Sequence, residues 1–341
     1  MQKSRRDFFG SVAWPAALWS GFSPRALTAA ESEAKPYRFP RCRLTPEPEH
    51  QTAFELAGKA TARWHFGPQY PRPFFFPFAG PCGASLTRLG HPGAPDHDHH
   101  RSIWFGHHDV AGVDFWSENT EGRIRQKHWL CYEDGEAQCV MAVRLGWFAG
   151  EPVRELMEQT LVAVARPREA GEHTLELQST FRPVAGPALL GRTNFGFLAV
   201  RVAKSISEFF GDGRLTDSEG RSTEADIFGK RACWVDYSGP VADGVVEGVT
   251  YFDHPQNPGA PTHWHVREDG WMGASFCMKE GWSLEPEQPL KLRYLLHAHS
   301  GRMDKDNAAA LLADFTAAPF YDVVPAETKH RQFELRPPAE R

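Results

Sequence analysis

Long hydrophobic segments are missing from this chain of 341 residues. No run of about 18 or more apolar residues occurs, which excludes a membrane-spanning helix. An excess of basic residues is also missing, because 38 Lys and Arg stand against 43 Asp and Glu. The formal net charge of -5 therefore argues against nucleic acid as a partner.

Several catalytic and metal-binding motifs are missing too. The six cysteines are scattered without C-x-x-C spacing, which argues against iron–sulfur clusters and cysteine-type zinc sites; their disulfide pairing cannot be deduced from the sequence. No G-x-S-x-G elbow, H-E-x-x-H helix, P-loop or G-x-G-x-x-G after a strand occurs. Serine hydrolases, helical zinc proteases and dinucleotide enzymes are therefore poor models for this chain.

Short runs of alternating apolar and polar residues are abundant, and they are separated by Gly, Pro, Asp or Asn. Such runs are typical of half-buried strands. Their number, with no alternating helices, predicts an all-β fold, a large antiparallel β-sandwich. One short C-terminal helix is predicted over 306–316, where Ala and Leu dominate. The predicted strands cover 53–56, 61–66, 128–132, 139–148, 154–166, 173–182, 195–202, 248–252, 262–266, 273–278 and 291–298.

The N-terminal segment reads as an export signal rather than as part of the fold. Ser4-Arg5-Arg6-Asp7-Phe8-Phe9 is similar to a twin-arginine signal, and a weakly apolar stretch follows it. We therefore expect a signal peptide over 1–30 and a periplasmic or secreted protein. The rest is predicted to be a single β-sandwich domain over 31–325, followed by a loose C-terminal tail over 326–341.

Histidine and aspartate gather in a first cluster, Asp96-His97-Asp98-His99-His100-Arg101, which continues to Trp116. If the segment is extended, His97 and His99 project to one face and His100 to the other. Two imidazoles on one strand face suit a divalent metal, so one such metal is a candidate cofactor held by His97 and His99. A polar ligand pocket without metal and a merely structural loop are the alternatives.

Two further clusters follow along the chain. Asp253-His254-Pro255-Gln256-Asn257-Pro258 precedes His263-Trp264-His265, where the two histidines share a strand face and Trp264 lies opposite. His297 and His299 repeat this spacing on a late predicted strand. The three pairs can form one site only if folding brings them together.

An aromatic surface carrying His, Asp and Arg on a β-sandwich suits a sugar, because indole faces stack on its C–H groups and the polar side chains bind its hydroxyls. The predicted acid–base or metal-ligand groups are four histidines and one carboxylate: His100, His107, His254, His265 and Asp114. The predicted substrate-binding residues are Arg101, Trp104, Trp116, Asn257, Trp264, Arg267 and His297. Arg101 and Arg267 would bind a carboxylate or a developing oxyanion.

The run from Asp96 to His107 resembles the hallmark of a bacterial domain family of unknown function that often bears the label "methane oxygenase PmoA". The resemblance spans about residues 70–300. It implies a galactose-mutarotase-like supersandwich and a setting among secreted sugar-catabolism proteins. The label does not suit the sequence, since methane monooxygenase subunits lie in the membrane. Further matching segments are 109–116, 229–239, 253–258, 264–267 and Arg293-Tyr294 with His297.

This chain departs from the family pattern at two places. Asp98 stands where the family usually has Pro, and Ser275-Phe276-Cys277 replaces an Asn-Pro-Phe-like stretch. The second departure alters one wall of any pocket that the resemblance implies.

These observations favour a carbohydrate-active enzyme, namely a lyase, hydrolase or epimerase acting on a glycoside or an oxidised sugar. A non-catalytic sugar-binding protein is the alternative, and it would bind sugars without turnover. A copper or iron redox protein is a third hypothesis, which a coloured or paramagnetic purified protein would support. The expected partner in the first two cases is a carbohydrate or a sugar-derived small molecule.

Overall fold

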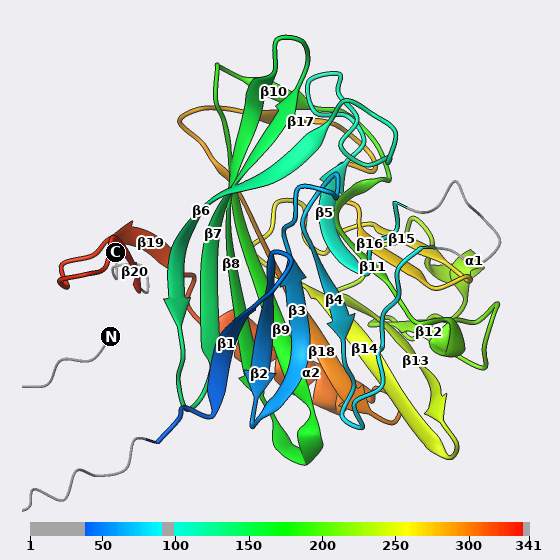
Figure 1. Ribbon diagram of the computed structural model, residues 1–341. Helices are drawn as coiled ribbons and strands as arrows, with labels where there is room; N and C mark the ends of the chain where they lie inside the picture. Colours follow the sequence, from blue (N-terminus) through cyan, green and yellow to red (C-terminus); the bar gives the residue numbers. More distant parts are fainter. Residues whose placement is uncertain (1–37, 91–98, 337–341) are drawn as a thin grey trace, which may run out of the picture. The chain divides into compact units, whose positions relative to one another are not determined.

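Two eight-stranded antiparallel sheets dominate the structure, a computed structural model that describes residues 38–90 and 99–336 (Figure 1). Both sheets belong to the unit that spans residues 40–341. The N-terminal unit, residues 1–39, is described only at its last two residues, so the expected signal peptide lies outside the described residues.

The first sheet, called sheet A here, has the strand order β1-β2-β3-β4-β5-β11-β16-β15. Each neighbouring pair of its strands is antiparallel. Its strands are β1 (Cys42–Glu47), β2 (Gln51–Leu56), β3 (Lys59–His65), β4 (Phe74–Phe78), β5 (Ile103–His107), β11 (Gly196–Arg201), β16 (Trp271–Ala274) and β15 (Trp264–Arg267).

The second sheet, sheet B, has the order β12-β13-β14-β18-β9-β8-β7-β6, and it is also antiparallel throughout. Its strands are β12 (Arg214–Asp217), β13 (Trp234–Ala242), β14 (Val245–Asp253), β18 (Leu290–Ser300), β9 (His173–Pro183), β8 (Arg154–Pro167), β7 (Cys139–Ala149) and β6 (Arg123–Glu133).

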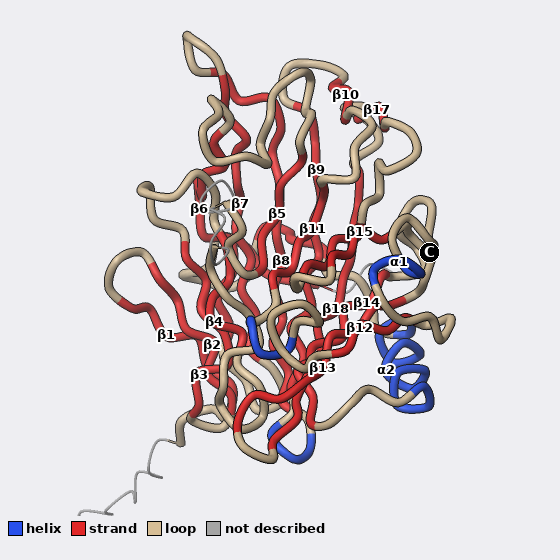
Figure 2. Tube along the Cα trace, turned by 90° about the vertical axis from the view of Figure 1, so that its right-hand side faces the viewer, coloured by secondary structure: helices blue, strands red, loops and turns tan. Residues whose placement is uncertain are grey.

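The remaining elements are short. Two small antiparallel pairs are β10 (Ala188–Leu190) with β17 (Trp282–Leu284), and β19 (Asp322–Pro325) with β20 (Phe333–Arg336). The helices are α1 (Glu224–Ile227), α2 (Lys305–Ala317) and the 3-10 turns η2 (Glu169–Gly171) and η3 (Lys204–Ile206). Figure 2 shows how strands dominate, with α2 as the longest helix. No helix in the described part of the chain is long and apolar enough to cross a membrane.

The two sheets face each other across one apolar core. Alternate residues of the sheet A strands, such as Phe105 on β5 and Leu198 on β11, meet inward residues of sheet B such as Leu177 on β9. Each fully buried side chain of this size stabilises the fold by about 1.5–3 kcal/mol. The prediction of an all-β antiparallel sandwich with one short C-terminal helix is confirmed.

The outer face of sheet A carries a second aromatic layer. Phe74, Trp104, Ala199 and Trp271 pack together there with Trp116, separately from the main core. The strand register explains this, because the pairing aligns residues across neighbouring strands, and aligned residues point to the same face.

The outer face of sheet B is covered by α2 and by the C-terminal hairpin. Leu311 and Phe315 of α2 pack on Leu295 of β18, and the Asp304 side chain caps the helix by accepting from two backbone N–H groups. The β19–β20 hairpin packs on apolar residues of β6, β7 and β8. The residues after Pro325, which we expected to form a loose tail, thus contribute a further strand, β20.

Candidate functional site

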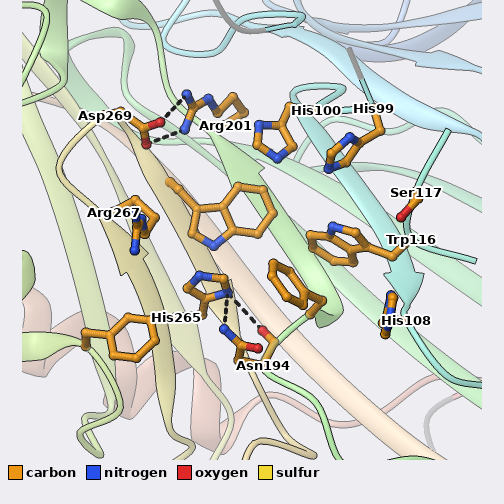
Figure 3. Close-up of a pocket in the computed structure, with 13 residues that line it drawn as sticks. His99, His100, His108, Trp116, Ser117, Asn194, Arg201, His265, Arg267 and Asp269 are labelled. Atoms are coloured by element: carbon orange, nitrogen blue, oxygen red, sulfur yellow. Dashed lines mark hydrogen bonds and ion pairs between the residues drawn. The ribbon is translucent and has the colours of Figure 1, made fainter. Parts of the chain in front are cut away.

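A cavity of about 430 Å³ lies over the outer face of sheet A, at strands β5, β11, β16 and β15 (Figure 3). This volume is in the range of small-molecule sites. We call it the sheet A pocket. Its lining residues are His99, His100, His108, Trp116, Ser117, Asn194, Phe195, Arg201, Phe228, His265, Arg267, Asp269 and Trp271.

Three tryptophans form the base of the pocket. The ring centroids of Trp104, Trp116 and Trp271 lie 5.2–5.5 Å from one another. Their indole N–H groups are buried, and none has a hydrogen-bond partner in the described part of the chain. Burying an unpaired N–H costs about 1–3 kcal/mol. Trp116 and Trp271 line the cavity, although their N–H groups themselves lie below its surface.

His265 stands on β15 with one ring nitrogen held and the other available. Its Nδ1 lies 3.0 Å from the backbone oxygen of Asn194, which also accepts from the Ser275 hydroxyl at 2.6 Å. Because a carbonyl oxygen only accepts, Nδ1 carries the proton. Burial lowers the pKa of His265 to about 4. At neutral pH the imidazole is therefore uncharged, with a lone pair on Nε2.

His99 and His100 lie on the opposite side of the cavity from His265 in Figure 3. They precede β5 in a turn, so the strand alternation that would place them on opposite faces does not apply, and both line the pocket. This corrects the expectation for an extended segment. The His100 ring lies 4.9 Å from the Trp271 ring, and the His265 ring lies 5.7 Å from it.

Two ion pairs fix the positions of charged side chains at the pocket wall. Arg201 is fully buried and pairs with Asp269 through two hydrogen bonds of 2.7 and 3.0 Å. Arg267, which is exposed, lies 3.1 Å from Glu224. Among the described residues Asp269 is the one lining carboxylate, it is paired with an arginine, and no second carboxylate of the kind that glycosidases use in pairs lines the cavity there.

Asp114 acts on the loop beside the pocket rather than in it. Its Oδ1 accepts from the backbone N–H groups of Trp116 at 2.6 Å and Ser117 at 3.0 Å. Burial would raise its pKa, but these hydrogen bonds and nearby His108 lower the pKa below its usual value. The ionised carboxylate therefore positions Trp116. The predicted substrate-binding Arg101 pairs with Glu118, packs 5.1 Å from the Tyr70 ring and does not line the cavity.

Two predicted site residues point into the core between the sheets instead. His107 follows Phe105 by two positions on β5 and shares its inward face; its Nε2 lies 3.0 Å from the Gly191 oxygen. Burial lowers the pKa of His107 to about 4. Trp264 is also buried, and its indole donates to the Ala232 oxygen at 2.8 Å. Because side chains alternate along a strand, His107 and Trp264 face away from the pocket, whereas Trp104 lies beneath it on the outer face of sheet A.

Three more predicted residues lie on β18 of sheet B or in the loop after its strand β14. His254 is buried beneath α2, where its ring lies 4.8 Å from that of Phe315. Asn257 donates to Asp253 at 2.7 Å, and both help to fix the loop after β14. His297 is buried with its Nε2 3.0 Å from Glu172. The expectation that His100, His107, His254 and His265 share one cleft therefore holds only for His100 and His265.

The residues beneath α2 form a hydrogen-bonded group, which we call the α2 cluster: His254 and Asn257 in the loop after β14, Arg293 on β18 and Glu176 on β9. The buried Arg293 donates from Nε to Glu176 at 2.6 Å and from Nη1 to the backbone oxygen of Ala318, just after α2, at 2.7 Å. Asn257 donates to the backbone oxygen of Arg293 and accepts from its backbone N–H, both at 2.8 Å. The motif 253–258 thus has a structural explanation.

A metal centre was predicted at His97 and His99. His97 lies outside the described residues, and His99 lines the sheet A pocket. Among residues 38–90 and 99–336, no group of three or more His, Cys, Asp or Glu side chains is arranged to hold a metal ion.

Several pocket residues escaped the sequence analysis, Trp271 above all. A signal for it exists: Glu268-Asp269-Gly270 forms a turn, and the register pairs Arg267 with Trp271, which puts both on the face that carries His265. Asn194 and Phe228 come from loops that are distant in the sequence, and no local pattern marks them.

Comparison with known proteins gives a family and two distant structural likenesses. A model described as a family of unknown function (DUF6807) matches residues 51–313. The match agrees with the resemblance to a domain family of unknown function and carries no information on the methane oxygenase label. No curated protein matches the chain.

Two of the solved structures that are similar to this chain show how remote the likeness is. A GalM/aldose epimerase homologue from C. elegans has a TM-score of 0.33 and 8% identity, and the match covers 77% of this chain and 99% of that one. A protein from the human microbiome, provisionally named a kojibiose phosphorylase, has a TM-score of 0.32 and 7% identity; the match covers 83% of this chain and 37% of that one. Likenesses at these scores carry no argument about function.

Proposed function

The chain belongs to this family of unknown function, and we propose that it is a carbohydrate-active enzyme that transfers protons on an oxidised sugar or a glycoside in the sheet A pocket. The observation that carries the proposal is the placement of two imidazoles, those of His100 and His265, against one indole, that of Trp271, which lines the cavity. A sugar ring stacked on this indole would have an imidazole on either side.

The base of the pocket supports a sugar as the ligand. Indole faces stack on the C–H groups of a pyranose, and Trp116 and Trp271 line the cavity with ring atoms above buried, unpaired N–H groups, which a ligand oxygen would reach if the indoles turned. Sugar hydroxyl, carbonyl and carboxylate oxygens are all acceptors for those N–H groups. The pocket therefore combines an apolar platform with donors that lack partners among the described residues, as expected for a ligand that is apolar on one face and rich in oxygen at its edge.

The state of His265 supports a role as general base. Its neutral Nε2 would accept a proton from the carbon next to a sugar carbonyl, and the electron pair of the broken C–H bond would move to the carbonyl oxygen as an enolate. An indole N–H would stabilise that oxygen. Return of a proton from His100 to the opposite face would give an epimer, whereas departure of a neighbouring oxygen substituent, protonated by His100, would give an unsaturated sugar.

Epimerisation and elimination are better supported than conventional hydrolysis. A two-carboxylate glycosidase needs an acid and a nucleophile or base on either side of the scissile bond. In the sheet A pocket Asp269 is held by Arg201, and Asp114 holds backbone N–H groups outside the cavity. The enzyme is therefore proposed as an epimerase or a lyase.

The experiment that tests the proposal is incubation in D₂O with a panel of hexoses, glycosides, uronates and keto sugars, followed by NMR. Incorporation of deuterium at one carbon or formation of an unsaturated product, both lost in His265→Asn, is the expected result. A sugar that binds without exchange or turnover would instead identify a non-catalytic sugar-binding protein. If no sugar of the panel binds, the carbohydrate proposal is wrong.

The twin-arginine-like segment at residues 4–9 supports export, and we propose that the reaction takes place in the periplasm or outside the cell. Fusion of residues 1–30 to a folded reporter tests this proposal. Transport that depends on Arg5 and Arg6 is expected, and retention of the reporter in the cytoplasm would contradict it.

A further inference from the structure

A second, smaller cavity of about 100 Å³ lies further along β15. Aromatic and basic side chains line it, together with one carboxylate: Arg231, His263, Phe276, Lys279, Glu280 and Trp282. The proposed function does not use these residues, and the sequence motif 229–239 contributes one of them, Arg231.

Three chain segments connect the two cavities, which places them side by side. His265 lines the sheet A pocket, and His263 lines the smaller cavity two residues away, at a distance of about 7 Å along a strand. Phe228 lines the first and Arg231 the second. In the third segment, Ser275 holds the Asn194 oxygen beside His265, and the next residue lines the smaller cavity.

The smaller cavity combines a stacking surface with positive charge. Phe276 and Trp282 lie 5.2 Å apart between ring centroids, and 38% of Trp282 is exposed. Arg231 is held by Nη1 contacts of 2.7 and 3.0 Å to two backbone oxygens of the loop 259–261. Neither Arg231 nor Lys279 forms an ion pair with a carboxylate in the described part of the chain, although Glu280 lines the same cavity.

Arg231 and Lys279 act on the pKa of the neighbouring His263. Burial, Arg231 and Lys279 lower the pKa of His263 below its usual value. An anion in the cavity would offset the two positive charges, so His263 reports on anion binding.

We propose that this cavity is a second subsite, which takes an acidic sugar unit linked to the ring in the sheet A pocket. The inference rests on the proposed function and deepens it, because it makes the substrate an acidic oligosaccharide or glycoside of at least two units. The second ring stacks on Trp282, and its carboxylate lies between Lys279 and Arg231. Gly229 turns the chain with a φ of 71° and donates to the Trp264 oxygen, which brings the motif 229–239 to this place.

The anion site is tested first without any sugar, by titrating sodium sulfate at constant ionic strength and following the NMR resonance of the His263 ring. We expect a saturable shift and a rise in the pKa of His263, both lost in Lys279→Gln and retained in Lys59→Gln, a matched change at an exposed lysine on β3. A linear response, or the same response in both variants, would overturn the anion site.

The link to the substrate is tested by comparing galacturonic acid with digalacturonic acid, with binding followed at His265. We expect digalacturonic acid to bind at least tenfold more tightly, and both Lys279→Gln and Trp282→Ala to remove that gain while leaving the monosaccharide affinity unchanged. Trp129→Ala is the matched control, because Trp129 is equally exposed at 38% and lies on β6.

The outcomes separate the two proposals. Monosaccharide binding at His265 without a gain for the disaccharide would overturn the second subsite and leave the proposed function standing. A sulfate response at His263 without a response of His265 to either sugar would overturn the substrate role of the subsite. In that case the cavity binds free anions only.

Discussion

The sheet A pocket and the α2 cluster contain the same kinds of residue, histidine and arginine among aromatic rings, yet the chain covers them differently. Beneath α2, Arg293 is fully buried, and its side chain bonds to Glu176 and to the Ala318 oxygen. On sheet A, Trp116 and Trp271 line a cavity of about 430 Å³, and their buried indole N–H groups have no partner within the described residues. In the α2 cluster the chain supplies most of the partners, with Nη2 of Arg293 as the exception, whereas at the sheet A pocket imidazole and indole side chains line a cavity of ligand size.

The difference shows that residue types alone do not identify a site. Helix α2 covers the α2 cluster, and the cavity of about 250 Å³ that remains there is lined by Glu176, Phe315 and Ala318. Nothing comparable covers the cavity over β5, β11, β16 and β15 in the described part of the chain. Function is therefore expected where imidazole and indole side chains line a cavity of ligand size, and stability where charged side chains bond mainly to one another beneath a helix.

The largest expected effect comes from replacing one histidine in the sheet A pocket and one in the α2 cluster. His265→Asn keeps a donor for the Asn194 oxygen and removes the Nε2 base, so turnover is expected to fall by about 10²–10⁴-fold, with the free energy of unfolding nearly unchanged. His254→Asn is the matched control and should leave turnover intact in folded protein. The turnover rate and the denaturant unfolding of both variants should be measured. Equal losses of turnover in the two variants would contradict the assignment of catalysis to the sheet A pocket.

Opening the α2 cluster should cost stability instead. Arg293→Met leaves Glu176 with only its contact to the half-buried Arg166, and the free energy of unfolding is expected to fall by about 3–5 kcal/mol. Lys291→Gln, on the exposed side of the same strand, should change it by less than about 0.5 kcal/mol. Urea unfolding measures both. A stable Arg293→Met variant that has lost sugar binding would reverse the assignment of the two regions.

Acid should destabilise both regions. The pKa values of His254 and His265 are lowered to about 4, mainly by burial, against an ordinary value near 6.5. The unfolded chain binds protons first, so stability is full above about pH 6.5 and decreases as the pH falls towards 4, by on the order of 2–3 kcal/mol per histidine. Unfolding midpoints across this range should vary less with pH in His254→Asn. An unchanged slope would mean that His254 titrates normally.

A smaller effect on sugar affinity should distinguish Trp271, which lines the pocket, from Trp104, which lies beneath it. Trp271→Phe keeps an aromatic face and removes the N–H, and sugar affinity is expected to fall by roughly tenfold, the value of one lost hydrogen bond. Trp104→Phe removes an equally unpaired N–H that does not line the cavity, so affinity should change little. Calorimetric titration of both variants decides. Equal affinities would mean that the ligand does not contact the Trp271 N–H.

The smallest expected effect is on stability and concerns the N-terminal cap of helix α2. Asp304→Ala removes the side chain that accepts from the N–H groups of Asp306 and Asn307 at 2.9 Å, which should lower the free energy of unfolding by about 1 kcal/mol. Sugar affinity should be unaffected because α2 covers sheet B only. A loss of affinity would show that the two regions are coupled.

Much of the fold could be predicted from local patterns. The strand expected at 139–148 is Cys139–Ala149, that expected at 173–182 is His173–Pro183, and the helix expected at 306–316 is Lys305–Ala317. These elements have one face in the core, and the alternation of apolar residues reports that face directly. Other strands were missed, such as Ile103–His107, which is buried on both faces and therefore shows no alternation.

The site was predicted only in part. Strand alternation correctly set His265 opposite Trp264, but it could not show that the inward face of β5 buries His107 while the turn before β5 presents both His99 and His100. Which clusters converge depends on the order of strands in the sheets, and that order follows from pairings between distant segments. The sequence pattern therefore grouped His254 with His265, although they lie on different sheets.

The most direct test of the account is the response of individual histidine rings to a saturating sugar from the deuterium-exchange panel, followed by NMR. The account predicts that the resonances of His100 and His265 shift, while those of His254 and His297 stay in place. Shifts at His254 or His297, with none at His265, would contradict it, because the ligand would then bind on the sheet B side of the fold and not in the sheet A pocket.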